Sequence, residues 1–250
     1  MPSSLQLNLF VPQPDPLTKE QLFSEKKRKE MQWVLSDEEY DFYKKHTRFV
    51  SYKELLWKLA QMKDWLNENI SDWSKTAFFI PYWKIKSNHR ITEHFYNNLS
   101  KCVHTTTLNN MKLRDYKTII IGDDAVASWR QLEQLLSFIS TTHKNSLKQD
   151  LSIILAIPFF TLNGFQSLKD NWIKTSWFNI IIPDIIDYIP TFDTYNNHII
   201  EKLEDISRFD RKEYRWLFVF EHKKPDDQPS IPHQLYNIIP SIKEPYKQTL

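Results

Sequence analysis

Glycine is nearly absent from this chain, whose 250 residues contain only Gly122 and Gly164. Walker A loops and dinucleotide fingerprints need several glycines at fixed spacing, because their backbone N–H groups must approach phosphates without a Cβ in the way. The sequence therefore excludes P-loop ATPases, kinases and Rossmann dehydrogenases. Gly122 stands directly before two acids, Asp123 and Asp124, which indicates a backbone constraint at that point.

The segment around Gly122 has the pattern of a strand that leads into a helix. The β-branched apolar run over 118–121 is typical of a buried strand. Apolar residues with helical spacing follow Ser128, namely Leu132, Leu135, Leu136 and Ile139. Ligands of open α/β sheets bind at the carboxyl ends of strands, beside helix N-termini that favour anions. Turn and capping chemistry explains the acid pair equally well, so a ligand site and a capped turn remain alternatives.

The composition is typical of a globular protein with one large domain or two small ones. Hydrophobic residues make up 41% of the chain, and no run reaches the roughly 18 apolar residues that a membrane span needs. We therefore expect no membrane span, and the N-terminus lacks the pattern of a secretory signal. The single cysteine, Cys102, rules out an internal disulfide and fits a reducing compartment, so we expect a cytoplasmic protein.

Metal sites and nucleic-acid sites are not indicated by the sequence. One cysteine and eight scattered histidines do not supply the clustered ligands of a zinc site. The formal net charge is only +2, and the basic run over 26–29 is interpreted as a solvated helix face. Asp184 and Asp187 lie in an apolar segment, where they could orient a base or bind Mg²⁺, while helix capping and solubility explain them equally well.

The chain divides by pattern into three parts. Residues 1–17 contain four prolines and are interpreted as an extended arm, and residues 18–72 show helical periodicity with capping signals. Residues 73–250 alternate short apolar strands with helices, which predicts an α/β domain with a mainly parallel sheet and helices on both faces. The predicted strands lie at 77–81, 118–121, 151–157, 178–182 and 216–220, and the predicted helices near 92–102, from 128, after 164 and over 197–209.

A second motif follows the last predicted strand, over residues 216–235. The apolar run ends at Phe220, and the polar and charged residues after it are His222, Lys223, Lys224, Asp226 and Asp227. A histidine at a strand end can act as a general base, as a donor to phosphate or as an ordinary surface residue. The two lysines suit an anion site and suit an exposed loop as well.

Together the two motifs resemble a phosphoribosyltransferase-like family of bacterial conflict and antiphage systems, some of it associated with retrons. The acid-pair segment resembles the motif with which type I phosphoribosyltransferases bind phosphoribosyl pyrophosphate (PRPP). The second motif is similar to the family's C-terminal signature, with His222, Pro225 and Pro232 in place. By this resemblance Asp123 and Asp124 contact the ribose hydroxyls. The residues that would wrap the phosphate are Ala125, Val126, Ala127, Ser128, Trp129 and Arg130.

The sequence departs from the family's pattern in both motifs. Trp129 stands where the family has glycine, and Lys223, Asp226 and Asp227 replace asparagines. A tryptophan crowds the approach of backbone N–H groups to a phosphate unless its ring points outward. Arg130 could replace the lost amide contacts with a charged fork. The site is therefore either remodelled and active or decayed.

The resemblance implies a type I phosphoribosyltransferase-like fold and a role as the effector of an antiphage system of the toxin or retron type. It implies PRPP or a related nucleotide as ligand, with Mg²⁺ on the pyrophosphate if the site is active. Protein partners in a defence complex are expected, and in a retron setting these include a reverse transcriptase with its RNA–DNA product. The alternative is a catalytically degraded module that acts in complex assembly or nucleotide sensing.

Overall fold

The chain forms two compact units, one made of residues 1–52 with 190–250 and one made of residues 53–189. The computed structural model describes residues 20, 23–32, 36–79, 91–92, 94–95, 99, 104–106, 116–126, 129–143, 151–173, 178–189 and 218–220. The predicted arm and the predicted helix over 197–209 lie outside these residues. The domain boundaries expected after residues 17 and 72 stay predictions.

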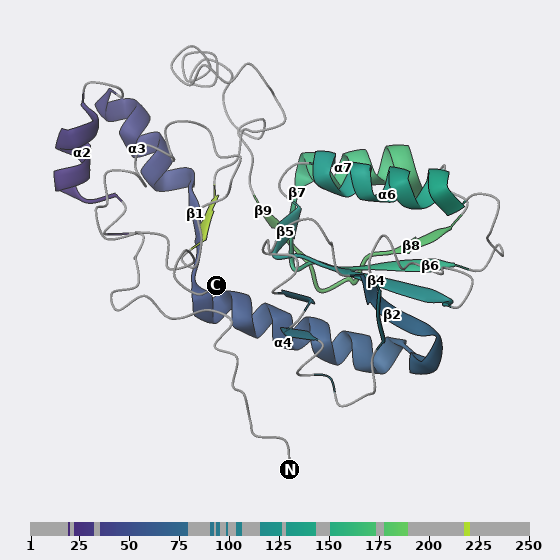
Figure 1. The fold of residues 1–250 in the computed structure, drawn as a ribbon. Helices are drawn as coiled ribbons and strands as arrows, with labels where there is room; N and C mark the ends of the chain where they lie inside the picture. Colours follow the sequence, from purple (N-terminus) through teal and green to yellow (C-terminus); the bar gives the residue numbers. More distant parts are fainter. Residues whose placement is uncertain are drawn as a thin grey trace, which may run out of the picture. The chain divides into compact units, whose positions relative to one another are not determined.

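The larger unit is built on a five-stranded parallel sheet (Figure 1). Its strand order is β3-β2-β4-β6-β8, and every neighbouring pair is parallel. The strands are β2 (Thr76–Phe79), β3 (His104–Thr106), β4 (Thr118–Gly122), β6 (Ser152–Ala156) and β8 (Asn179–Ile181). Isoleucine, threonine and phenylalanine recur in them, as expected for parallel strands that are covered on both faces. The parallel α/β sheet predicted from the alternating pattern is confirmed.

Helices cover both faces of this sheet. Figure 1 shows α6 (Trp129–His143) and α7 (Leu162–Leu168) over one face and α4 (Tyr52–Asn69) over the other. A row of paired residues faces the α6 and α7 side and joins the core there, namely Ala77, Ile119, Ile153 and Ile180. The buried face of α4 carries Leu55, Leu59, Met62 and Leu66. Each fully buried side chain of this size contributes about 1.5–3 kcal/mol.

Three strands of the main sheet are interrupted at one level and then continue as a second parallel sheet. The continuing strands are β5 (Ala125–Val126), β7 (Phe159–Thr161) and β9 (Asp187–Ile189). Ala125 pairs with Phe159, and Phe159 pairs with Asp187. The sequence pattern does not predict these strands, because two or three residues carry too little periodicity.

The described residues of the smaller unit form two helices and a two-stranded parallel sheet. The helices are α2 (Glu25–Met31) and α3 (Asp37–His46), which confirm the helical periodicity of this part of the chain. In the sheet, β1 (Arg48–Val50) pairs with β10 (Phe218–Phe220). The strand predicted over 216–220 thus exists as β10. Its partner β1 was not predicted, because its three residues lie within the part of the chain, 18–72, that shows helical periodicity.

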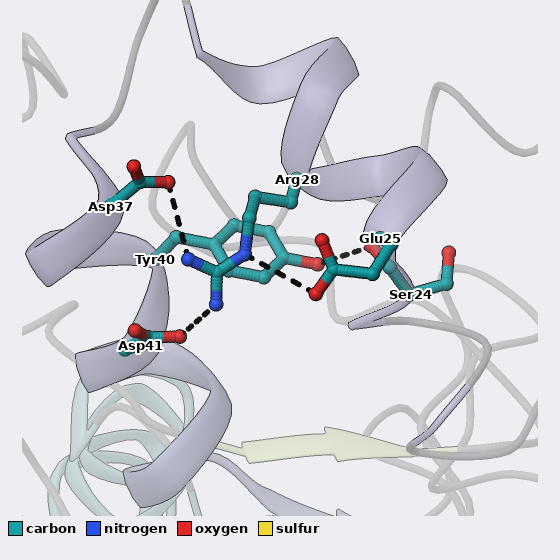
Figure 2. A network of polar contacts seen from close by, with 6 residues as sticks. All are labelled: Ser24, Glu25, Arg28, Asp37, Tyr40 and Asp41. Carbon is teal, nitrogen blue, oxygen red and sulfur yellow. Dashed lines mark hydrogen bonds and ion pairs between the residues drawn. The ribbon is translucent and has the colours of Figure 1, made fainter.

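Arg28 ties α2 to α3 (Figure 2). Its guanidinium donates to Asp37 Oδ1 at 3.1 Å and to Asp41, and its Nε lies 3.6 Å from Glu25 Oε1. The hydrogen bond to Asp41, followed by the one to Asp37, raises the pKa of Arg28. The basic run over 26–29 is therefore not a uniform solvated face, because Arg28 turns toward the acids of the next helix.

Tyr40 packs between this guanidinium and the buried ring of Phe23. The centre of the guanidinium lies 4.9 Å from the Tyr40 ring centroid, and Phe23 meets that ring edge-on at 5.9 Å. The Tyr40 hydroxyl donates to the carbonyl oxygen of Ser24 at 2.9 Å. Burial raises the pKa of Tyr40 to about 12. The tyrosine therefore stays a neutral hydrogen-bond donor throughout the physiological range.

We expect Arg28→Met to lower the thermal unfolding temperature of the protein, whereas Lys26→Met on the exposed side of the same helix leaves it unchanged. The variant leaves three carboxylates without their cation and removes the cation over the Tyr40 ring. Because the acids are 59–75% exposed, the difference should shrink in 1 M salt, which screens exposed charges. Circular dichroism melting measures both effects, and equal melting temperatures for the two variants would contradict this role of Arg28.

Candidate functional site

The acid pair lies at the carboxyl edge of the main sheet, at the point where the strand order reverses. In chain order the strands of this sheet are arranged second, first, third, fourth and fifth, so the reversal falls between β2 and β4. In open α/β sheets the crevice outside the carboxyl ends at this point is where ligands bind. Asp123 and Asp124 follow β4 directly at this edge. Their place at the end of a parallel strand is the one that the sequence pattern predicts.

Both carboxylates hydrogen-bond to the backbone of the interruption. The N–H of Asp124 donates to Asp123 Oδ1 at 2.9 Å, and the N–H of Ala125 donates to Asp124 Oδ1 at 2.9 Å. An interrupted strand leaves N–H groups without ladder partners, and short acidic side chains satisfy such donors. Asp123 is half-buried, and Asp124 is buried with an exposed fraction of 2%. These bonds fix the direction in which each carboxylate points.

The six residues expected to wrap a phosphate occupy different surroundings. Ala125 and Val126 form β5, which pairs with β7, and the Val126 side chain lies in the hydrophobic core. Trp129 and Arg130 are the first residues of α6. Residues 127–128 lie outside the described residues. The backbone of the first two residues is thus used in a sheet, while the roles of all six stay predictions.

The second motif follows β10, a strand of the smaller unit. Strand β10 ends at Phe220, two residues before His222, and it pairs with β1 in the smaller unit. The residues of the motif lie outside the described part of the chain, namely His222, Lys223, Lys224, Asp226 and Asp227. Their predicted contacts with a phosphate-bearing ligand stay predictions.

Both glycines of the chain are close to the acid-pair segment. A Cβ on Gly122 would lie 3.1 Å from Thr92 Oγ1 and 3.5 Å from the Thr92 nitrogen. A Cβ on Gly164 would lie 2.8 Å from Thr161 Oγ1 and 3.1 Å from Val126 Cγ1. Side chains at these two positions would therefore push against the neighbours, because protein interiors are close-packed. Because glycine has no side chain, Thr92 can pack directly against the end of β4, and the start of α7 can pack directly against Val126.

Gly164 also completes the junction between β7 and α7. The Thr161 side chain caps α7, and its Oγ1 accepts a hydrogen bond from the Gly164 N–H at 3.0 Å. Such a cap satisfies one of the free N–H groups at a helix start. Since Gly164 packs against Val126, the cap holds the start of α7 against the strand that follows the acid pair.

Lys58 is a buried lysine, not predicted from the sequence as a site residue, whose side chain reaches the interruption between β8 and β9. Lys58 of α4 donates to Asp187 Oδ1 at 2.7 Å and to the carbonyl oxygen of Ile185 at 3.3 Å. The sequence leaves the role of Asp187 open, and the structure pairs it with this lysine. One signal could have pointed to Lys58, because it interrupts the apolar stripe of its helix between Leu55 and Leu59.

His94 lies near the α4 side of the larger unit. It is half-buried, and desolvation followed by the charge of Lys63 lowers its pKa. Its ring meets Phe95 edge-on at 6.1 Å, and Phe95 in turn stacks on Phe78 of β2 at 5.9 Å. His94 is therefore neutral at pH 7.

Stability should fall on acidification because of His94. Its pKa in the folded state lies below the value of about 6.5 in an unfolded chain. The unfolded state then binds more protons as the pH falls below about 6.5, so the free energy of unfolding decreases. We expect His94→Gln to flatten this loss between about pH 6.5 and 5, and Lys63→Met to give an intermediate slope. Urea unfolding at stepped pH measures the slopes, and equal slopes in wild type and His94→Gln would overturn the prediction.

Gly122→Ala should lower the free energy of unfolding by about 1–3 kcal/mol, the usual cost of overpacking. The Thr92 hydroxyl is buried and makes no hydrogen bond in the described part of the chain, so its removal breaks none. We therefore expect Gly122→Ala to cost less in a Thr92→Ala background than in wild type. Urea denaturation of the four proteins gives this double-mutant cycle, and the same cost in both backgrounds would contradict the close approach.

A comparison with solved structures finds a weak likeness to a known protein. No protein-family model matches the chain, and no curated protein matches it. The solved structure of Helicobacter pylori xanthine-guanine-hypoxanthine phosphoribosyltransferase is similar, with 16% sequence identity and a TM-score of 0.35. The match covers 62% of this chain and 97% of that chain. The α/β fold class follows from the strand order itself.

In the part of the chain that the structure describes, no helix combines the length and the apolar character that crossing a membrane requires.

Proposed function

We propose that this chain is a phosphoribosyltransferase-like protein that binds PRPP, or a related ribose-phosphate or nucleotide ligand, at Asp123 and Asp124. The position of the acid pair supports this proposal. The two acids follow β4 at the reversal of the strand order, and both glycines of the chain pack around their segment. If the acid pair only capped a turn, it would not need to lie where the strand order reverses, and the neighbouring elements would not need to pack closely against Gly122 and Gly164.

The chemistry of two adjacent carboxylates suits a ribose. Carboxylate oxygens accept hydrogen bonds from hydroxyl groups, and Asp123 with Asp124 offers two acids to two neighbouring hydroxyls. In transfer from PRPP, pyrophosphate leaves through an oxocarbenium-like transition state that carries positive charge on the sugar. Fixed carboxylates beside the ribose stabilise that charge, since the backbone bonds already hold their direction.

The acid pair fits a magnesium ion that arrives with the ligand. Mg²⁺ is usually held by one or two carboxylates together with substrate phosphates and water. Asp123 and Asp124 supply carboxylate oxygens, and the described residues contain no group of three potential metal-ligating side chains. When bound, the ion would neutralise charge on the pyrophosphate.

In the cell we propose a role as the effector of a bacterial antiphage system of the toxin or retron type, on the strength of the two sequence motifs. Its partners there would be proteins of the defence complex, including in retron systems a reverse transcriptase with its RNA–DNA product. One observation favours the alternative of a degraded module for assembly or nucleotide sensing. Ala125 and Val126 pair in β5, so the start of the expected phosphate loop is not open.

Calorimetric titration with PRPP and Mg²⁺ tests the site. We expect saturable binding by the wild type, and loss of at least tenfold in affinity in Asp123→Asn/Asp124→Asn. Asparagine keeps the Oδ1 acceptors that hold the backbone, so the double variant should fold while losing the charge. Asp64→Asn, at an exposed position of α4, is the matched control and should bind as wild type does. If wild type does not bind PRPP at millimolar concentration, the acid pair serves only to cap the turn. That result would favour the alternative of a degraded module for assembly or nucleotide sensing.

A further inference from the structure

We propose that Lys58 is the cation recruited by the anionic phosphate or pyrophosphate group of the ligand, and that Asp187 is its partner in the unliganded protein. This inference rests on the proposed function, since it concerns the same edge of the sheet. Lys58 belongs to α4 and crosses to the strand interruption that precedes β9. Its Nζ lies 2.7 Å from Asp187 Oδ1.

The strand register aligns this ion pair with the acid-pair segment. Asp187, Phe159 and Ala125 are successive partners across β9, β7 and β5. Ala125 directly follows the acid pair, and its N–H is the donor to Asp124. Neighbouring strands lie about 4.8 Å apart, so the two ends of this row are roughly 10 Å apart. A ligand that carries both a sugar and phosphates can span such a distance.

The charge at this edge creates the need for a cation. Asp123 and Asp124 follow β4, Asp184 follows β8, and Asp187 is the first residue of β9. Carboxylates suit ribose hydroxyls and repel a phosphate group. Lys58 is a cation that already contacts this edge, and an ammonium group binds phosphate as a point charge on a flexible stem.

The ion pair can open without leaving a buried charge. The Lys58 side chain is 10% exposed, whereas the Asp187 side chain is 32% exposed, so water can solvate the carboxylate once its partner has moved. The second acceptor of Lys58, the carbonyl oxygen of Ile185, is at 3.3 Å and so is easily exchanged.

An exposed aromatic ring, that of Trp57, lies beside the charged end of Lys58. The Lys58 ammonium lies 5.2 Å from the centroid of the Trp57 ring, and Trp57 is 57% exposed. An aromatic face at this distance attracts a cation, so Asp187 is not the only group that holds the ammonium. The Lys58 side chain is thus largely buried as a whole, with its charged end over an exposed ring.

Opposite effects of two substitutions test this exchange. Titration with PRPP and Mg²⁺ should show at least tenfold weaker binding in Lys58→Gln, which removes the cation. Asp187→Asn should bind severalfold more tightly than wild type, because Lys58 no longer has to leave a charged partner. Lys58→Arg keeps the charge and should retain most of the affinity. Thermal melting should show a loss of stability in both Lys58→Gln and Asp187→Asn, since each breaks the same ion pair.

The outcomes separate this inference from the proposed function. Weaker binding by Asp187→Asn, in step with its loss of stability, would show a purely structural clamp and overturn the exchange. Unchanged affinity in Lys58→Gln would overturn it as well, while saturable wild-type binding that Asp123→Asn/Asp124→Asn abolishes would leave the proposed function intact. An absence of wild-type binding would remove the acid-pair site and the exchange with it.

Discussion

The larger unit depends on the burial of a parallel sheet between two layers of helices. Ile119, Ile120 and Ile121 of β4 are all buried, so consecutive side chains meet apolar neighbours on opposite faces. Parallel strands need crossover connections, and these bring the carboxyl ends of all five strands to one edge. Polar groups are costly to bury within strands that are covered on both faces. The acid pair, the strand interruptions and the Lys58 ion pair therefore lie at or beyond the carboxyl ends of these strands.

Three neighbouring strands, β4, β6 and β8, are interrupted at the carboxyl edge of the sheet and continue as β5, β7 and β9. Regular pairing stops after Gly122 and Ala156, which face each other across β4 and β6, and it resumes at Ala125 and Phe159. Backbone donors that leave a ladder must find other acceptors, and the carboxylates beside them fill that need. The same bonds that satisfy the backbone also fix the direction in which the two carboxylates point.

Particular residues show how far sequence reasoning reaches. The β-branched run over 118–121 and the helical spacing of Leu132, Leu136 and Ile139 predict β4 and α6 correctly, because local periodicity carries that information. Strand β5 was not predicted because two residues are too few to show an alternating pattern. Strand β1 was not predicted because its strand character depends on pairing with β10, about 170 residues away. Lys58 is missed for a similar reason, since its partner Asp187 is distant in the chain.

The sequence by itself determined the class of fold, the place of the acid pair after a parallel strand and the absence of any glycine-rich phosphate loop. These properties follow from residue type and short-range periodicity, which act along the chain. The tertiary structure alone decided the reversal of strand order beside Asp123, the packing of Thr92 and Val126 against the two glycines, and the pairing of Lys58 with Asp187. Those features arise from contacts between segments far apart in sequence, and such contacts leave no local pattern to detect.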